Sequence, residues 1–246
     1  MSAPGRGTSE GSSKPRKEGG LRAAGVAIGL TVAALVFATI GSVFIAVLIS
    51  ISGLDTESPL IIGSAIVIGQ VGFFIPAYLY VRRYGLHIPI KHPDYRDLRY
   101  TAGGVVIALV IAAASVAILE TTGLTPEAAI EDLIEVDVTM VLLFAILSIL
   151  VVAPIEEFLF RGVVQGRLRE TFSAPVAIGG ASLLFGSLHI PNYIGSLVTI
   201  LAGAVLITSV SVVFGVIYER TENLLVPIIT HGVYNALLSF FSYLTM

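Results

Sequence analysis

The sequence predicts an all-α protein, a polytopic bundle of transmembrane helices. Hydrophobic residues make up 55% of the 246 residues and charged residues only 13%, whereas a soluble domain carries roughly 25% charged residues. The mean hydropathy is +0.93. The apolar residues are also grouped into long runs, and a helix needs about 20 of them to cross a bilayer. We therefore expect most of the chain to lie within a membrane.

Seven apolar runs predict seven membrane spans. The runs are 23–53, 60–81, 101–119, 138–165, 174–190, 194–218 and 224–244. The first run is longer than a span requires, so we expect it to be tilted or broken near Gly41, and a complete break would make eight spans. Residues 1–22 are polar and basic without an apolar period, which predicts a disordered tail ahead of a helical domain at 23–246.

The charges between the runs predict the orientation and exclude several functions. The segments 82–100 and 166–172 are basic, whereas 120–137 carries six acidic residues and no Lys or Arg. By the positive-inside rule, the N-terminus is cytoplasmic in a multi-pass protein of the cell membrane. The scattered Lys and Arg residues form no basic stripe, so we expect no nucleic-acid partner. The absence of Cys excludes cysteine nucleophiles and thiolate metal sites.

Three charged residues interrupt the fourth apolar run: Glu156, Glu157 and Arg161. A charge at the centre of a bilayer costs at least ~2.5–3.5 kcal/mol, so such residues indicate a functional site. Glu157 and Arg161 are four residues apart and share a helix face, which predicts an ion pair. Glu156 points about 100° away. It is therefore free to act as a general base.

Other polar residues are expected at the same depth. His189 and His231 follow or lie within apolar runs, and Asn235 is one turn beyond His231. At 1.5 Å per residue, Glu156 and these three side chains all fall in one layer near the middle of the membrane. Phe185 precedes His189 by one turn, so its ring can pack beside the imidazole. Pro154 and Pro227 predict kinks in their helices, and Pro191 predicts the end of the fifth span.

Three short motifs resemble one family. Glu156 to Arg161 match EExxxR, Phe185 to His189 match FxxxH, and His231 to Asn235 match HxxxN, in order. They resemble the CPBP family of intramembrane proteases, which includes the type II CAAX prenyl endopeptidases and the bacteriocin-immunity (Abi) proteins. The resemblance covers residues 138–246, which we expect to be the protease core.

The resemblance implies an endopeptidase that cleaves a membrane-associated protein or peptide, such as one with a CAAX-type prenylated C-terminus. It implies that Glu156 and His189 activate water, and that His231 and Asn235 stabilise the oxyanion. Glu157 and Arg161, with Phe185, would order the site.

Whether the site holds a metal stays open at this point. Glu156, His189 and His231 are the ligand types of a catalytic Zn²⁺, as in a metalloprotease. A zinc site also needs a separate base, and the available Glu157 is expected to pair with Arg161, which favours a metal-independent glutamate mechanism.

Two other functions remain as alternatives. Intramembrane Glu and His residues also form the relays of proton-coupled transporters, but the sequence lacks the inverted repeats typical of many transporters. A non-catalytic immunity or adaptor protein is the second alternative, and the complete set of polar residues argues against it.

Overall fold

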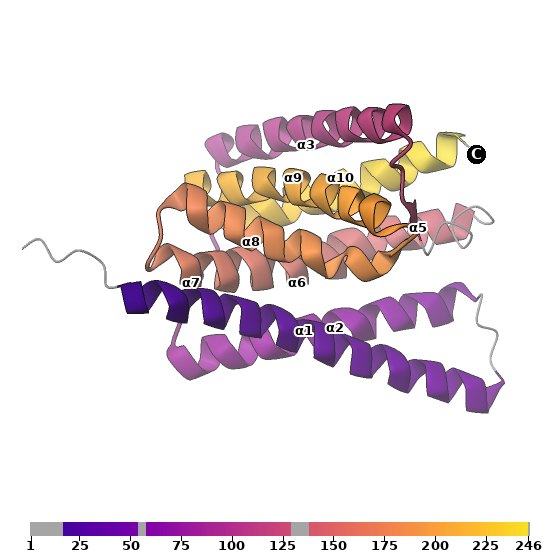
Figure 1. Cartoon of the computed structure of the whole chain (residues 1–246), viewed down its shortest axis with the longest axis horizontal. Helices are drawn as coiled ribbons and strands as arrows, with labels where there is room; N and C mark the ends of the chain where they lie inside the picture. The colour runs from indigo at the N-terminus through magenta and orange to yellow at the C-terminus, as the bar shows by residue number, and fades with distance from the viewer. Residues whose placement is uncertain (1–16, 54–57, 129–137, 246) are drawn as a thin grey trace, which may run out of the picture.

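The structure is a computed structural model that describes residues 17–53, 58–128 and 138–245. Long helices lie side by side and cross each other at small angles (Figure 1). The elements are α1 (Lys17–Ser52), α2 (Pro59–Tyr84), α3 (Tyr95–Thr122), β1 (Glu127–Ala128), α5 (Val138–Leu147), α6 (Ala153–Glu157), α7 (Gly166–Arg169), α8 (Ala174–Leu188), β2 (Tyr193–Ile194), α9 (Leu197–Thr221) and α10 (Leu225–Thr245). Two π-helical segments, Ser148–Val152 and Phe158–Gln165, and a 3₁₀ turn, Ile190–Asn192, complete them.

The expected all-helical fold is confirmed: within the described residues, seven helices are long and apolar enough to cross a membrane. Of the two alternatives for the first span, the break is wrong, because α1 runs without interruption through Gly41. There the missing side chain allows close packing, since a Cβ on Gly41 would lie 2.9 Å from Ile68 of α2. The helix also begins at Lys17, so residues 17–22 are helical rather than part of a disordered tail. The rest of the expected tail, 1–16, lies outside the described residues.

The fourth span, Val138–Arg169, is one helical rod whose turns widen around the two glutamates. Pro154 has no N–H to donate to the preceding turn, and the rod adjusts by i→i+5 pairing, as in the bond from the Ala153 N–H to the Ser148 carbonyl. The π-helical segments lie on both sides of α6, which carries Glu156 and Glu157. Such wide turns are frequent at functional sites.

The predictions made from Pro191 and Pro227 had different outcomes. The fifth span does end near Pro191, where α8 gives way to the 3₁₀ turn. The predicted kink at Pro227 is wrong, because α10 begins at Leu225 and Pro227 lies in its first turn. The first N–H groups of a helix have no partner within it, so proline fits there without distortion.

Two apolar clusters form the core on either side of the fourth span. One joins α1, α2 and α8 to the rod through buried residues that include Phe160, Val164 and Phe185. The other joins α3, α9 and α10 through residues that include Phe214 and Tyr234. His231 lies where the two clusters meet, because its ring contacts Phe185 of the first and Phe214 of the second.

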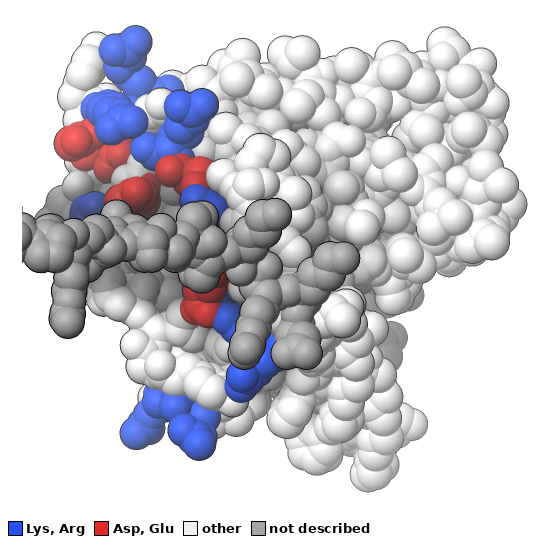
Figure 2. Space-filling model, turned by 60° about the vertical axis from the view of Figure 1, so that its left-hand side comes forward, with Lys and Arg blue, Asp and Glu red and all other residues white. Residues whose placement is uncertain are grey.

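Most of the exposed charged side chains among the described residues gather at one end of the bundle. Figure 2 shows the Lys and Arg side chains together with acidic ones on this end, beside a surface without charges. Here the fully buried Asn223 donates to the Lys91 carbonyl at 3.1 Å and to the Asp97 carboxylate at 2.9 Å. These bonds tie the segment after α2 to the turn between α9 and α10. At the other end, β1 and β2 pair antiparallel, with Glu127 opposite Ile194.

Candidate active site

Glu157 and Arg161 form the expected ion pair, and both side chains are completely buried. The Arg161 Nε donates to Glu157 Oε2 at 2.9 Å. The two other guanidinium nitrogens donate to Ser182 Oγ on α8 at 3.3 Å and to Ser211 Oγ on α9 at 2.5 Å. A buried ion pair is stable only when its remaining hydrogen-bonding groups are also satisfied. The sequence analysis missed both serines, although each stands in an apolar span.

Glu157 also holds His231, which the sequence analysis did not anticipate. His231 Nδ1 lies 3.0 Å from Glu157 Oε1. Because the carboxylate in contact with Arg161 can only accept, Nδ1 carries the hydrogen of this bond. The other ring nitrogen, Nε2, lies 4.0 Å from Glu156 Oε2. Glu157 therefore contacts both Arg161 and His231 and orients the imidazole relative to Glu156.

Glu156 is held by Gln70 of α2, a second residue that the sequence analysis missed. Gln70 Nε2 donates to Glu156 Oε1 at 3.0 Å, and both residues are buried, with 8% and 6% of their surfaces exposed. Within the described part of the chain, Gln70 Oε1 has no hydrogen-bond partner. The signal was present in the sequence, because Gln70 is the only amide side chain in the run 60–81. As expected, Arg161 does not pair with Glu156.

Phe185 connects the two histidines. Its ring centroid lies 4.8 Å from that of His189, which confirms the expected packing, and 5.9 Å from that of His231. The Arg161 guanidinium lies 5.8 Å from the same ring. His189 follows the last residue of α8 and is half-buried. Its Nδ1 lies 2.9 Å from the Phe185 carbonyl, which can only accept, so a neutral His189 keeps the lone pair on Nε2.

His231 and Asn235 lie one turn apart on α10, as the motif predicts. The His231 ring stacks on Phe214 of α9 at a centroid distance of 4.8 Å, and this contact fixes the ring from the side of the second cluster. Asn235 is half-buried, and its side-chain amide makes no hydrogen bond to another described residue. The amide is therefore available to a ligand.

The arrangement does not fit a three-ligand metal site. Among the described residues, no three His, Asp or Glu side chains converge closely enough to hold a metal ion. The interpretation as a metalloprotease is thus not supported, and no step below depends on a metal.

Comparisons with known proteins find similarity in the C-terminal part of the chain. Residues 138–237 match the family model described as type II CAAX prenyl endopeptidase Rce1-like. The uncharacterized protein YpbD of Bacillus subtilis (strain 168) is 29% identical over 149 residues, which are 60% of this chain and 71% of that protein. No solved structure matches the chain significantly. The matched residues contain all three motifs, from Glu156 to Asn235. Residues 138–237 are therefore similar to the Rce1-like type II CAAX prenyl endopeptidase family, in agreement with the resemblance of the three motifs.

Proposed function

We propose that this protein is an intramembrane endopeptidase that uses Glu156 as its general base. The observation that carries the proposal is the difference between the two adjacent carboxylates. Glu157 contacts both Arg161 and His231, whereas the hydrogen bond of Glu156 comes from the neutral amide of Gln70. One carboxylate thus has a structural role, and the other remains available to take a proton.

In the proposed reaction, Glu156 takes a proton from a water molecule whose oxygen attacks the carbonyl carbon of the substrate. The carbonyl π electrons move to its oxygen and form a tetrahedral oxyanion. When the oxyanion collapses, the C–N bond breaks, and Glu156 returns the proton to the departing nitrogen. His189 assists through Nε2, whose lone pair accepts a hydrogen bond from the attacking water.

His231 and Asn235 stabilise the oxyanion in this mechanism. Glu157 accepts a hydrogen bond from Nδ1 and fixes the His231 ring. In the proposed step the ring acts as an imidazolium stabilised by Glu157, and its Nε2–H donates to the oxyanion. The Asn235 amide supplies a second donor from the same helix face. Donors that are already oriented towards a developing charge are often the largest single contribution to acyl transfer, and one such donor is worth about 10²–10³ in kcat. The buried setting strengthens both interactions.

The proposed substrate is a membrane-associated protein or peptide, of which a CAAX-type prenylated C-terminus is one candidate. The test is to reconstitute the purified protein in liposomes with a farnesylated CAAX peptide and an unprenylated copy, and to identify the products by mass. Release of the tripeptide after the prenylated cysteine is the expected result. A protein that moves protons across the same liposomes but leaves every peptide intact would support the transporter alternative.

Gln70 is proposed to position Glu156. A hydrogen bond to a charged group contributes about 1.5–3 kcal/mol. We therefore expect Gln70→Leu to lower kcat on the order of tenfold or more with KM nearly unchanged, and also to lower the melting temperature, because the buried Glu156 loses its hydrogen bond. Gln70→Asn, which keeps the amide, should recover part of the loss. Ser64→Ala is the control, because Ser64 is on the same helix and bonds only the Leu60 carbonyl. Equal losses in the Leu and Asn variants would argue against positioning by the amide.

We further propose that the charged end of the bundle faces the cytoplasm, as the positive-inside rule predicts. The chain contains no Cys, so single cysteines can report the orientation. We expect a membrane-impermeant thiol reagent to label Glu120→Cys but not Lys91→Cys in intact cells, and to label both after permeabilisation. The reverse pattern would place the N-terminus outside.

A further inference from the structure

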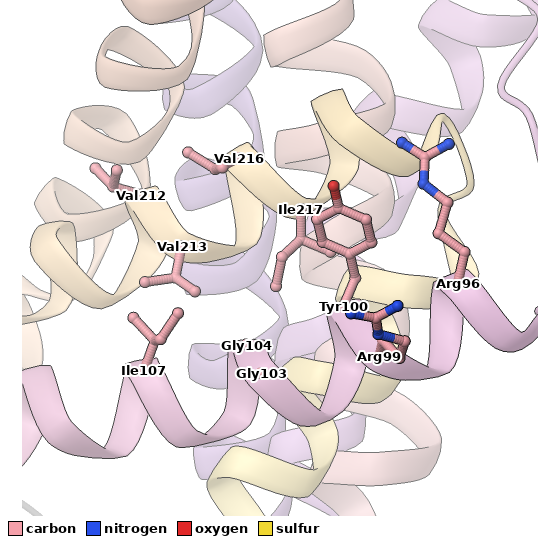
Figure 3. Close-up of a pocket in the computed structure, with 10 residues that line it drawn as sticks. All are labelled: Arg96, Arg99, Tyr100, Gly103, Gly104, Ile107, Val212, Val213, Val216 and Ile217. Carbon is pink, nitrogen blue, oxygen red and sulfur yellow. The ribbon is translucent and has the colours of Figure 1, made fainter.

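A groove on the outer surface of the bundle is separate from the proposed active site. It has a volume of about 650 Å³ and lies between α3 and α9. Figure 3 shows Arg96, Arg99 and Tyr100 at one end of this groove, and Ile107 of α3 facing Val213 of α9 at the other. The next residue of α9, Phe214, stacks on His231. The helix α9 therefore contacts both the groove and the His231 ring.

The dimensions of the groove suit one leaflet of a bilayer. From Arg96 to Ile107, α3 rises by about 16 Å at 1.5 Å per residue. This is about half of the ~30 Å hydrocarbon thickness. Beyond the arginines the lining is apolar, and Gly103 leaves space, since a Cβ placed on it would have no neighbour within 4 Å. One hydrocarbon chain can therefore lie between the two helices.

The polar end of the groove carries positive charge without an acidic partner. Arg96 donates to the Arg220 carbonyl at 3.1 Å and lies over the Tyr100 ring, and among the described residues neither Arg96 nor Arg99 forms an ion pair. Asp97 lies between them in sequence, but it is buried and accepts from Asn223. Both guanidinium groups are exposed and can receive an anion.

A second groove on the bundle lacks the net positive charge of the first groove. It has a volume of about 700 Å³, lies between α8 and α9, and is also lined by Val212 and Val216. Its polar end holds Glu219 beside Arg220, and Glu219 is paired with Arg169 at 2.9 Å. Acidic and basic groups therefore balance there.

We propose that the groove between α3 and α9 binds an anionic phospholipid. Its phosphate lies against Arg96 and Arg99, and one of its acyl chains follows Gly103 between the helices. Basic pockets between transmembrane helices bind anionic lipid headgroups on the cytoplasmic side of membranes, where such lipids are concentrated. The proposal concerns a site outside the active site and stands whether or not the protein is a peptidase.

Native mass spectrometry of the detergent-solubilised full-length protein can test the proposal. The probes are phosphatidylglycerol and phosphatidylcholine with the same acyl chains. We expect preferential retention of phosphatidylglycerol, and on the order of fivefold weaker binding for each arginine removed in Arg96→Gln and Arg99→Gln. Gly103→Leu should fill the groove and weaken phosphatidylglycerol binding with both arginines in place.

Matched variants separate this site from general effects. Arg82→Gln with Arg83→Gln removes two charges from α2 at the same end of the bundle. Gly29→Leu adds the same side chain on α1, where a Cβ also has open space. We expect both controls to bind like the wild type. Equal retention of the two lipids, equal losses in the controls, or displacement of the lipid by soluble glycerol phosphate would each overturn the proposal.

Discussion

Replacing Glu156 by Gln is expected to lower kcat by about 10²–10⁴, the usual contribution of a positioned general base. Glutamine has nearly the same shape, and its side-chain oxygen can still accept the bond from Gln70 that Glu156 accepts at 3.0 Å. The fold and KM should therefore change little, so the loss measures the proton transfer itself. The measurement is the rate of peptide cleavage in liposomes at saturating substrate, together with the melting temperature of each variant.

Two further variants test this expectation. Glu156→Ala should be at least as inactive, whereas Glu170→Gln, a change of the same type at an exposed ion pair with Arg167, should retain full activity. Peptide cleavage at the wild-type rate by both Glu156 variants would show that the proton acceptor is another group. Cleavage by Glu156→Gln alone would instead show that the side chain holds the water without taking its proton.

Replacing Arg161 by Leu is expected to destabilise the protein by about 3–5 kcal/mol, because it leaves the buried carboxylate of Glu157 without its cation. Three hydrogen bonds from the guanidinium, to Glu157, Ser182 and Ser211, are lost at the same time. His231, the proposed oxyanion donor, should also lose its orientation, since it bonds the same carboxylate. Unfolding by a denaturing detergent, followed by circular dichroism, gives the change in the free energy of unfolding.

A double variant distinguishes a stranded charge from lost packing. Glu157→Gln removes the charge but keeps an acceptor for His231, so Arg161→Leu with Glu157→Gln should be more stable than Arg161→Leu alone. The control is Arg169→Leu, which breaks the partly exposed pair with Glu219 and should cost no more than about 1 kcal/mol. If the two substitutions in the double variant instead destabilise additively, the charge of Glu157 is not what makes Arg161 necessary.

The sequence by itself determined the features that follow from periodicity and local spacing. Seven apolar runs gave seven helices, because in a bilayer each backbone must satisfy its own hydrogen bonds. The pairing of Glu157 with Arg161 and the packing of Phe185 on His189 were predictable because both partners lie one turn apart on the same chain segment. The kinks were less predictable, since the effect of Pro154 and Pro227 depends on where each falls in its helix.

Only the tertiary structure decided which side chains from other helices contact Glu156 and Glu157. Gln70 reaches Glu156 across 86 residues of chain, and His231 reaches Glu157 across 74. No local pattern encodes these contacts, because they depend on how α2 and α10 pack against the fourth span. The same packing set the 4.0 Å separation of Glu156 Oε2 and His231 Nε2. The motif spacing identified the two glutamates as candidate site residues. The proposal that Glu157 orders the site and that Glu156 takes the proton depends on the neighbours that folding brings to each.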